Sequence, residues 1–160
     1  MIDILIIILL CYLVGSFPTS IVVGRLFFHK DIRDYGSGNA GGTNTVRVLG
    51  WKAGIPVILI DIAKGAVAVL WVSRLRLVGD GGVPAELLST EALALAAGIA
   101  AVCGHIWTVF AGFRGGKGVA TAAGMIAALY PLGFSAAVIV FIVVVTFTGI
   151  VSIGSMSAAV

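Results

Sequence analysis

The feature that most limits the folds open to this chain is a series of apolar stretches, each about as long as a helix needs to cross a bilayer. A hydrocarbon core of about 30 Å requires about 20 apolar residues in helical conformation. Hydrophobic residues make up 60% of the 160 residues and charged residues 11%, which is not the composition of a soluble globule. In lipid, each backbone N–H and C=O must be paired within the protein, and helices achieve this within one stretch. The sequence therefore predicts an all-α, polytopic transmembrane helical bundle.

Polar segments divide the chain into about five spans and the start of a sixth. The predicted spans are residues 2–24, 53–73 and 92–111, a fourth that begins near 119 and a fifth that ends near 148. Pro18 favours a kink in the first span, and Pro131 and Gly133 favour a turn between the last two. Residues 152–160 look like a sixth span that stops after about two turns. We therefore expect residues 1–160 to be a single integral membrane domain, incomplete at its C-terminus.

The distribution of basic residues predicts the orientation. Short cytoplasmic loops carry an excess of Lys and Arg. The first and third loops contain seven of these residues and the second loop two: Arg25, Lys30, Arg33, Arg47, Lys52, Arg114 and Lys117, against Arg74 and Arg76. We expect the N-terminus outside and the first and third loops in the cytoplasm. Cations in such loops favour anionic headgroups or small phosphorylated molecules as partners, rather than nucleic acid.

The third loop, residues 112–118, combines four glycines with Arg114 and Lys117. Glycine lets a ligand approach backbone N–H groups, which can form an anion-binding nest, and the two cations favour a phosphate. A basic loop that only fixes topology is the alternative, but it leaves the glycines unexplained. The loop is not a P-loop, because Ala111 and Gly118 stand where that motif needs Gly and Ser or Thr.

The first loop contains the densest polar run, residues 35–47. Residues 36–41 spell G-x-G-x-x-G, but charged residues precede them instead of a buried strand, which excludes a dinucleotide-binding fold. The hydroxyls, carboxamides and planar guanidinium of this run suit phosphate oxygens. A second interpretation is a helix cap, with Thr43 or Asn44 as the N-cap residue. Both can hold, because such a cap would aim a helix dipole at a bound anion.

Three ionisable residues lie inside predicted spans. Asp61 and Lys64 are three residues apart on one helix face, and we expect either a structural ion pair or a ligand contact, since a buried charge is costly. His105, near the end of the third span, is either a hydrogen-bonded packing residue or a general base.

Two further patterns indicate less chemistry. His29 and Asp34 form an H-x-x-x-x-D, a pattern typical of one class of glycerolipid acyltransferases, but a solvated pair explains them in a basic interfacial stretch. Cys11 and Cys103 lie in apolar runs and are expected to be small core residues. No metal-ligand spacing occurs, and we expect neither a metal nor a cofactor.

Three motifs, in this order, resemble the bacterial acyl-phosphate:glycerol-3-phosphate acyltransferase family: SGNAGGTNTVR at 37–47, DIAKG at 61–65, and Gly104-His105 followed by FRGGKGVAT at 113–121. The resemblance implies a multi-pass enzyme of the bacterial inner membrane with its active site facing the cytoplasm. It would transfer a fatty acyl group from acyl-phosphate to the 1-hydroxyl of sn-glycerol 3-phosphate, giving lysophosphatidic acid and phosphate, the first step of phospholipid synthesis. A transporter or binder of a small phosphorylated anion is the alternative.

The resemblance and the residue chemistry together predict the site. Expected catalytic residues are Ser37, Arg47, Lys117 and His105. Expected substrate-binding residues are Asn39, Thr43, Asn44, Lys64, Gly115, Gly116, Gly118, Ser152 and Ser155. Gly149 stands where the family commonly has a basic residue, and the family's C-terminal His, Asn and Glu are not in this sequence.

Overall fold

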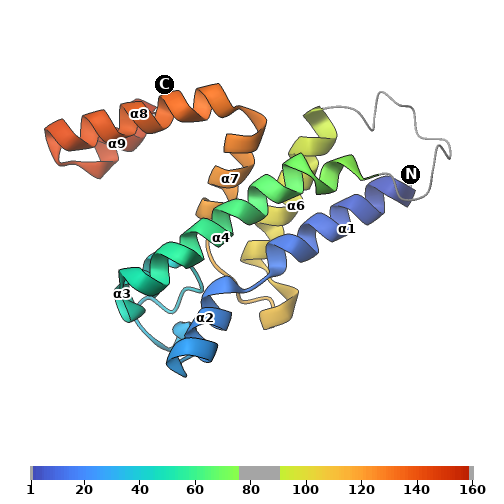
Figure 1. Ribbon diagram of the computed structural model, residues 1–160, viewed down its shortest axis with the longest axis horizontal. Coiled ribbons are helices and arrows are strands. Elements are labelled where there is room, and N and C mark those ends of the chain that lie inside the picture. Colours follow the sequence, from blue (N-terminus) through green and yellow to red (C-terminus); the bar gives the residue numbers. More distant parts are fainter. Residues whose placement is uncertain (1, 76–90, 159–160) are drawn as a thin grey trace.

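The computed structural model describes residues 2–75 and 91–158. Arg76, counted above in the second loop, lies outside these residues. The described chain is helical and contains no strand: α1 (Ile2–Ser16), α2 (Thr19–Phe28), η1 (Ile32–Asp34), α3 (Gly42–Leu49), α4 (Trp51–Leu70), η2 (Val72–Arg74), α6 (Glu91–Ile106), η3 (Val109–Ala111), α7 (Val119–Leu129), α8 (Pro131–Thr148) and α9 (Val151–Ala158). Figure 1 shows α1, α4 and α6 running alongside one another, with α8 and α9 extending from the end of α7. The predicted all-α class is confirmed.

Four segments of the described chain are long and apolar enough to cross a bilayer: Ile2–Phe28, Trp51–Arg74, Glu91–Ala111 and Pro131–Thr148. The region predicted to hold the fourth and fifth spans divides at Tyr130 and Pro131 into α7, an apolar helix of 11 residues, and α8, of 18 residues. Proline suits the first position of α8, because an N–H group there would have no intrahelical acceptor and proline has none to leave unpaired. Helix α9 occupies the place expected for the start of a sixth span and has 8 residues.

The first span is broken into α1 and α2 at Phe17 and Pro18, as the proline predicts. The break leaves the Phe17 carbonyl outside the regular ladder of helical hydrogen bonds. That oxygen accepts hydrogen bonds from Thr19 N and from the Lys64 ammonium of α4, each at 3.0 Å. The kink therefore supplies a polar partner to a charged side chain inside the bundle.

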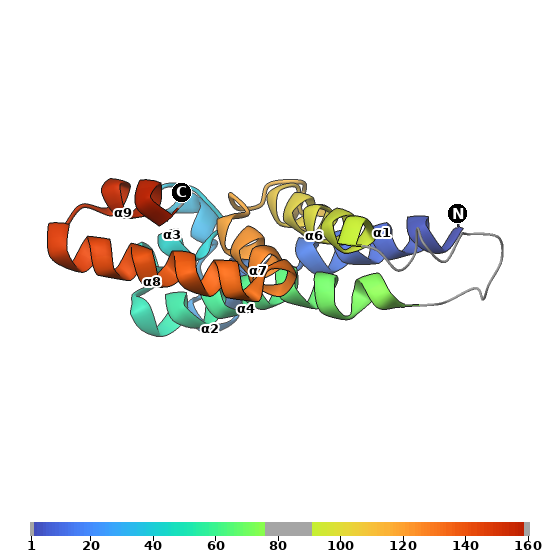
Figure 2. The ribbon, with the colours of Figure 1, turned by 90° about the horizontal axis from the view of Figure 1, so that it is seen from above.

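Small residues let the helices approach closely. A Cβ atom on Gly15 or Gly104 would overlap the backbone across the α1–α6 contact, and one on Gly65 or Gly124 would do the same across the α4–α7 contact. Such close backbone approach drives helix association in a membrane, where lipid offers no hydrophobic driving force. Figure 2 shows α4, α6 and α7 gathered at the centre of the molecule, while α8, none of whose residues is buried, extends beyond them.

Replacing Gly124 by alanine is expected to destabilise the protein. The new methyl group would overlap the Ile62 carbonyl of α4, and overpacking of this kind costs about 1–3 kcal/mol. The loss should appear in a thermal melt in detergent even though alanine favours helix over glycine by about 1 kcal/mol. Gly133→Ala in α8 is the matched control, because the nearest atom, Tyr130 Cβ, is 4.0 Å away. Equal melting temperatures for the two variants would contradict the close packing of α4 and α7.

Candidate active site

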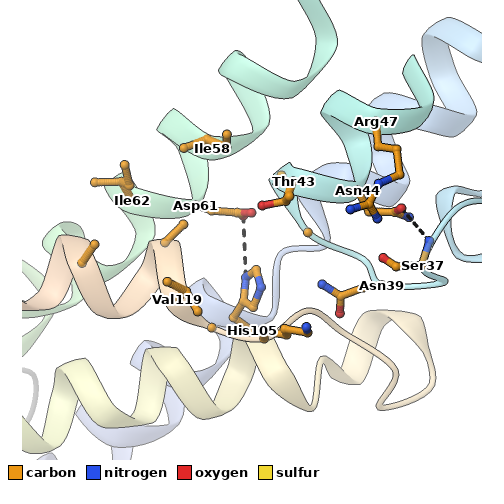
Figure 3. A pocket seen from close by; sticks show the side chains of 16 residues that line it. Ser37, Asn39, Thr43, Asn44, Arg47, Ile58, Asp61, Ile62, His105 and Val119 are labelled. Atoms are coloured by element: carbon orange, nitrogen blue, oxygen red, sulfur yellow. Dashed lines mark hydrogen bonds and ion pairs between the residues drawn. The ribbon is translucent and has the colours of Figure 1, made fainter. Parts of the chain in front are cut away.

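A cavity of about 460 Å³ lies where the first loop, α3, α4, α6 and the start of α7 meet. Figure 3 shows side chains from these elements converging on it. It is lined by Ser37, Asn39, Gly41, Gly42, Thr43, Asn44, Arg47, Ile58, Asp61, Ile62, His105, Lys117, Gly118, Val119, Ala120 and Ala123. The cavity therefore brings together most of the residues expected from the sequence, including Arg47 of α3 and Lys117 of the third loop, which are 70 positions apart.

Two helices begin at this cavity. Gly41 and Gly118 are the N-caps of α3 and α7, and both line it. The first N–H groups of a helix have no intrahelical acceptor, and the helix dipole places partial positive charge there. The expectation that Thr43 or Asn44 is the N-cap is wrong, because both lie within α3 and no side chain caps it. A glycine cap leaves the N–H groups of α3 open to an anion.

Asn44 shapes the first loop. Its Oδ1 accepts a hydrogen bond from Ser37 N at 2.9 Å, and its Nδ2 donates to the carbonyls of Ile32 and Tyr35 at 3.1 and 3.0 Å. Gly36, with φ +61°, passes so close that a Cβ atom would overlap Asn44 Oδ1. Asn44 lines the cavity, and its amide is hydrogen-bonded to the loop backbone, so it positions Ser37. Its expected contact with substrate stays a prediction.

The two cations at the cavity, Arg47 and Lys117, have no ion-pair or hydrogen-bond partner among the described residues. The ion-paired carboxylates Asp31 and Asp61 have other cations as partners. Arg114, in the same loop as Lys117, is exposed but is not among the lining residues. The structure thus separates the two cations of the glycine-rich loop and leaves Lys117 and Arg47 available to an anion in the cavity.

Asp61 and His105 line the cavity and form a buried cluster with Lys64. Lys64 Nζ lies 2.9 Å from Asp61 Oδ1 and 3.1 Å from His105 Nδ1, and Thr19 Oγ1 donates to Asp61 Oδ1 at 2.9 Å. Figure 3 shows Asp61 above the His105 ring, and Asp61 Oδ1 lies 3.7 Å from His105 Nδ1. Of the two interpretations, the structure favours the ion pair. Lys64 was also expected to contact substrate. Its ammonium instead donates to the Phe17 carbonyl, and Lys64 is not among the residues that line the cavity.

The glycines of the third loop fold that loop onto the end of α6. Gly115 N donates to Ile106 O and Gly116 N to His105 O, each at 3.0 Å. A Cβ atom on Gly115 would overlap the His105 carbonyl, and one on Gly116 would overlap His105 Nε2. This corrects the expected nest at these two positions, because their N–H groups already have acceptors. Gly118, at φ +77°, remains at the cavity as the cap of α7.

The two expected serines lie elsewhere. Both are on α9, which packs against α8. Ser155 lines a separate, apolar groove with Ala137, Val138 and Phe141, and the side chain of Ser152 lies outside what the structure describes. His29 and Asp34 are both exposed and absent from the cavity lining, so the structure offers no support for an H-x-x-x-x-D site.

Sequence reasoning missed a clamp between the two loops. Arg33 donates to Asp31 through Nε at 3.0 Å and Nη2 at 2.8 Å, and its Nη1 donates to the Ala111 carbonyl at 3.0 Å. Arg25 adds a bond to Asp31 at 2.7 Å. The Arg33 guanidinium holds the pKa of Asp31 well below its ordinary value, and the carboxylate raises the pKa of Arg33. The clamp joins the loop before the first motif to the loop before the third.

Fold and site together define a class: a multi-pass helical membrane protein whose cavity suits a small anion. Comparison with known proteins agrees. The family model described as glycerol-3-phosphate acyltransferase matches residues 5–160. Glycerol-3-phosphate acyltransferases of Chlorobaculum parvum (strain DSM 263 / NCIMB 8327) and Chlorobaculum tepidum (strain ATCC 49652 / DSM 12025 / NBRC 103806 / TLS) are each 51% identical over 160 residues, covering 100% of this chain and 68% of each relative.

Two solved structures are also similar. Both are crystal structures of PlsY (YgiH), an integral membrane glycerol 3-phosphate acyltransferase. The glycerol 3-phosphate form has a TM-score of 0.72 at 32% identity and covers 97% of this chain and 72% of that one. The lysophosphatidic acid form has a TM-score of 0.69 at 31% identity, with 97% and 71% covered. This chain belongs to the glycerol-3-phosphate acyltransferase family, which confirms the resemblance drawn from its three motifs.

The clamp gives the protein an acid-sensitive contribution to stability. The pKa of Asp31 in the folded protein lies below its ordinary 3.8, so the ion pair stabilises fully above that value and is lost as pH falls through the lower, folded pKa. Asp31→Asn is expected to melt at a lower temperature than wild type at neutral pH, and the gap should narrow as the pH approaches about 3. Melts across this pH range measure it.

The control is Asp34→Asn, three residues away and exposed, since its carboxylate forms no ion pair within the described residues. The difference in melting temperature between Asp34→Asn and wild type should stay small at every pH. A gap for Asp31→Asn that widens on acidification would contradict the assignment.

Proposed function

We propose that the protein transfers a fatty acyl group from acyl-phosphate to the 1-hydroxyl of sn-glycerol 3-phosphate, releasing lysophosphatidic acid and phosphate. One observation carries the proposal: two cations that have no partner within the described part of the chain meet two helix N-termini at one cavity. Both substrates are phosphate monoanions or dianions, for which such a site is suited. Family membership supports it, as do the PlsY structures in glycerol 3-phosphate and lysophosphatidic acid forms.

The reaction does not require the protein to form a covalent bond with a substrate. Acyl-phosphate is an activated mixed anhydride, and the glycerol hydroxyl oxygen attacks its carbonyl carbon. A new ester C–O bond forms, the anhydride C–O bond breaks, and phosphate leaves with the electron pair while the hydroxyl proton ends on a phosphate oxygen. Catalysis then consists mainly of holding two anions in reacting geometry and stabilising the charge that develops.

The described residues divide this work. Arg47 and Lys117, with the first N–H groups of α3 and α7, would bind and orient phosphate groups. The Ser37 hydroxyl and the Asn39 amide line the cavity and form no side-chain hydrogen bond within the described residues, so they remain free to contact the reacting carbonyl or hydroxyl. Asn44 would act through Ser37, by fixing the loop that presents it.

Lys117→Ala is expected to lower kcat/KM for glycerol 3-phosphate by about 10²–10³-fold, the usual cost of removing one charge-stabilising donor. The measurement is conversion of labelled glycerol 3-phosphate to lysophosphatidic acid by full-length protein in lipid vesicles supplied with acyl-phosphate. Arg114→Ala is the matched control, because it removes a neighbouring exposed cation that does not line the cavity. Similar activities for the two variants would contradict the proposed phosphate site, and an inactive wild-type protein would contradict the function.

The proposal includes a location in the bacterial inner membrane with the cavity facing the cytoplasm. The excess of basic residues in the first and third loops supports it, because these loops contribute Arg47 and Lys117. In a background without Cys11 and Cys103, Lys30→Cys is expected to resist a membrane-impermeant maleimide in intact cells, whereas Arg74→Cys, beyond α4, should react. The opposite labelling pattern would place the cavity outside.

A further inference from the structure

The hydrogen bonds around Lys64 determine which nitrogen of His105 carries a proton. An ammonium group has three N–H donors and no acceptor. Lys64 Nζ meets three acceptors: Asp61 Oδ1 at 2.9 Å, the Phe17 carbonyl at 3.0 Å and His105 Nδ1 at 3.1 Å. Each donor is therefore used once, and Nδ1 must offer a lone pair to the third.

The reverse assignment fits the geometry less well. A proton on Nδ1 would set two donors against each other at 3.1 Å, and its other neighbour, Asp61 Oδ1, is 3.7 Å away, beyond hydrogen-bond distance. That oxygen already accepts from Thr19 and Lys64. A neutral lysine would also leave the buried Asp61 carboxylate without its counter-ion, which is costly.

A neutral imidazole whose Nδ1 accepts a hydrogen bond carries its proton on Nε2. Within the described residues Nε2 has no hydrogen-bond partner. It lies beside Gly116, where a Cβ atom would overlap it. The His105 ring lines the cavity and also a smaller adjoining pocket that Gly116 lines. The Nε2–H bond therefore has no acceptor among the described protein residues, on the edge of the ring away from Lys64.

We propose that His105 serves the reaction as a hydrogen-bond donor through Nε2–H and not as the general base, with Lys64 and Asp61 as positioning residues that fix this tautomer. This assignment rests on the proposed function for its substrate. The partner would be a negatively charged oxygen, either on a substrate phosphate or on the carbonyl as it becomes an oxyanion. A lone pair on Nδ1 that is already bonded to an ammonium cannot take the hydroxyl proton.

The tautomer can be measured without any activity. In protein labelled with ¹⁵N-histidine, ring nitrogens with and without a proton resonate far apart, and the signals that disappear in a His105→Gln variant but not in a His29→Gln variant belong to His105. At neutral pH we expect an unprotonated Nδ1 and a protonated Nε2 for His105. A protonated Nδ1, in either a neutral or a doubly protonated ring, would overturn the proposal whatever the fate of the proposed function.

Lys64→Met tests the positioning role in the same spectrum. Without the ammonium, Nδ1 loses its donor, and a small movement of the ring would bring an Nδ1–H within hydrogen-bond distance of the Asp61 carboxylate, which has lost its counter-ion. The Nδ1 signal is therefore expected to move toward the protonated position. An unchanged spectrum in a variant that still folds would overturn the role of Lys64.

Two amide substitutions separate a donor from a base. Glutamine places its amide nitrogen near the position of Nε2, whereas asparagine reaches only the position of Nδ1, and neither amide can act as a base. We expect His105→Asn to lose about 10²–10³-fold in acyl transfer and His105→Gln to stay within about tenfold of wild type, with an unchanged pH profile. Equal losses for both, or a pH limb that disappears in His105→Gln, would overturn the donor role.

The steady-state constants identify the oxygen that is contacted. A loss in His105→Asn confined to KM for glycerol 3-phosphate assigns the donor to its phosphate, and a loss in kcat assigns it to the developing oxyanion. Both results support a donor at Nε2. Wild-type constants in His105→Asn would overturn it.

Discussion

The burial of the Asp61 carboxylate is the constraint on which the site depends. A charge inside a membrane bundle is stable only when it is paired and hydrogen-bonded, and breaking a buried pair costs about 3–5 kcal/mol. Asp61 obtains its partners from two parts of the chain, the Thr19 hydroxyl beside the Pro18 break and the Lys64 ammonium one turn along α4. Lys64 in turn needs the free Phe17 carbonyl and His105. One ion pair thereby fixes the positions of α1, α2, α4 and α6 relative to each other.

The contrast between satisfied and unsatisfied charge explains why the cavity can hold an anion. Lys64 has a protein acceptor for every donor, so it adds little attraction for a ligand. Arg47 and Lys117 have none within the described residues and face the same space as the starts of α3 and α7. Positive potential is therefore concentrated at the mouth of the bundle, where water and substrate can reach it, and is neutralised deeper inside, where it would be costly.

The sequence predicted what depends on local pattern. Apolar length predicted the four long apolar segments of the described chain, and Pro18 predicted the break in the first. The spacing of Asp61 and Lys64 placed both on one helix face but left an ion pair and a ligand contact open. The motifs predicted that Arg47 and Lys117 share a site. The role of Asn44 could not be predicted, because its partners are backbone carbonyls at positions 32 and 35 that no residue type identifies. The Arg33 bond to Ala111 spans 78 positions and has the same difficulty. The glycines at 115 and 116 suggested ligand contact, but their close approach to α6 is visible only in three dimensions.

The glycine-rich loop has two structural roles: it packs against the end of α6, and it starts α7 at the cavity. Gly115 and Gly116 donate to the last carbonyls of α6, which ends the helix at His105 and Ile106 and brings the loop against the imidazole. Two residues later Gly118 turns the chain with positive φ and starts α7 at the cavity. Lys117 lies between these two features. Because Gly116 has no side chain, its backbone can pack beside His105 Nε2, where a Cβ atom would overlap that nitrogen. A larger residue at 116 would therefore disturb the cation and the imidazole together, which makes this loop the physical link between the buried ion pair and the exposed phosphate site.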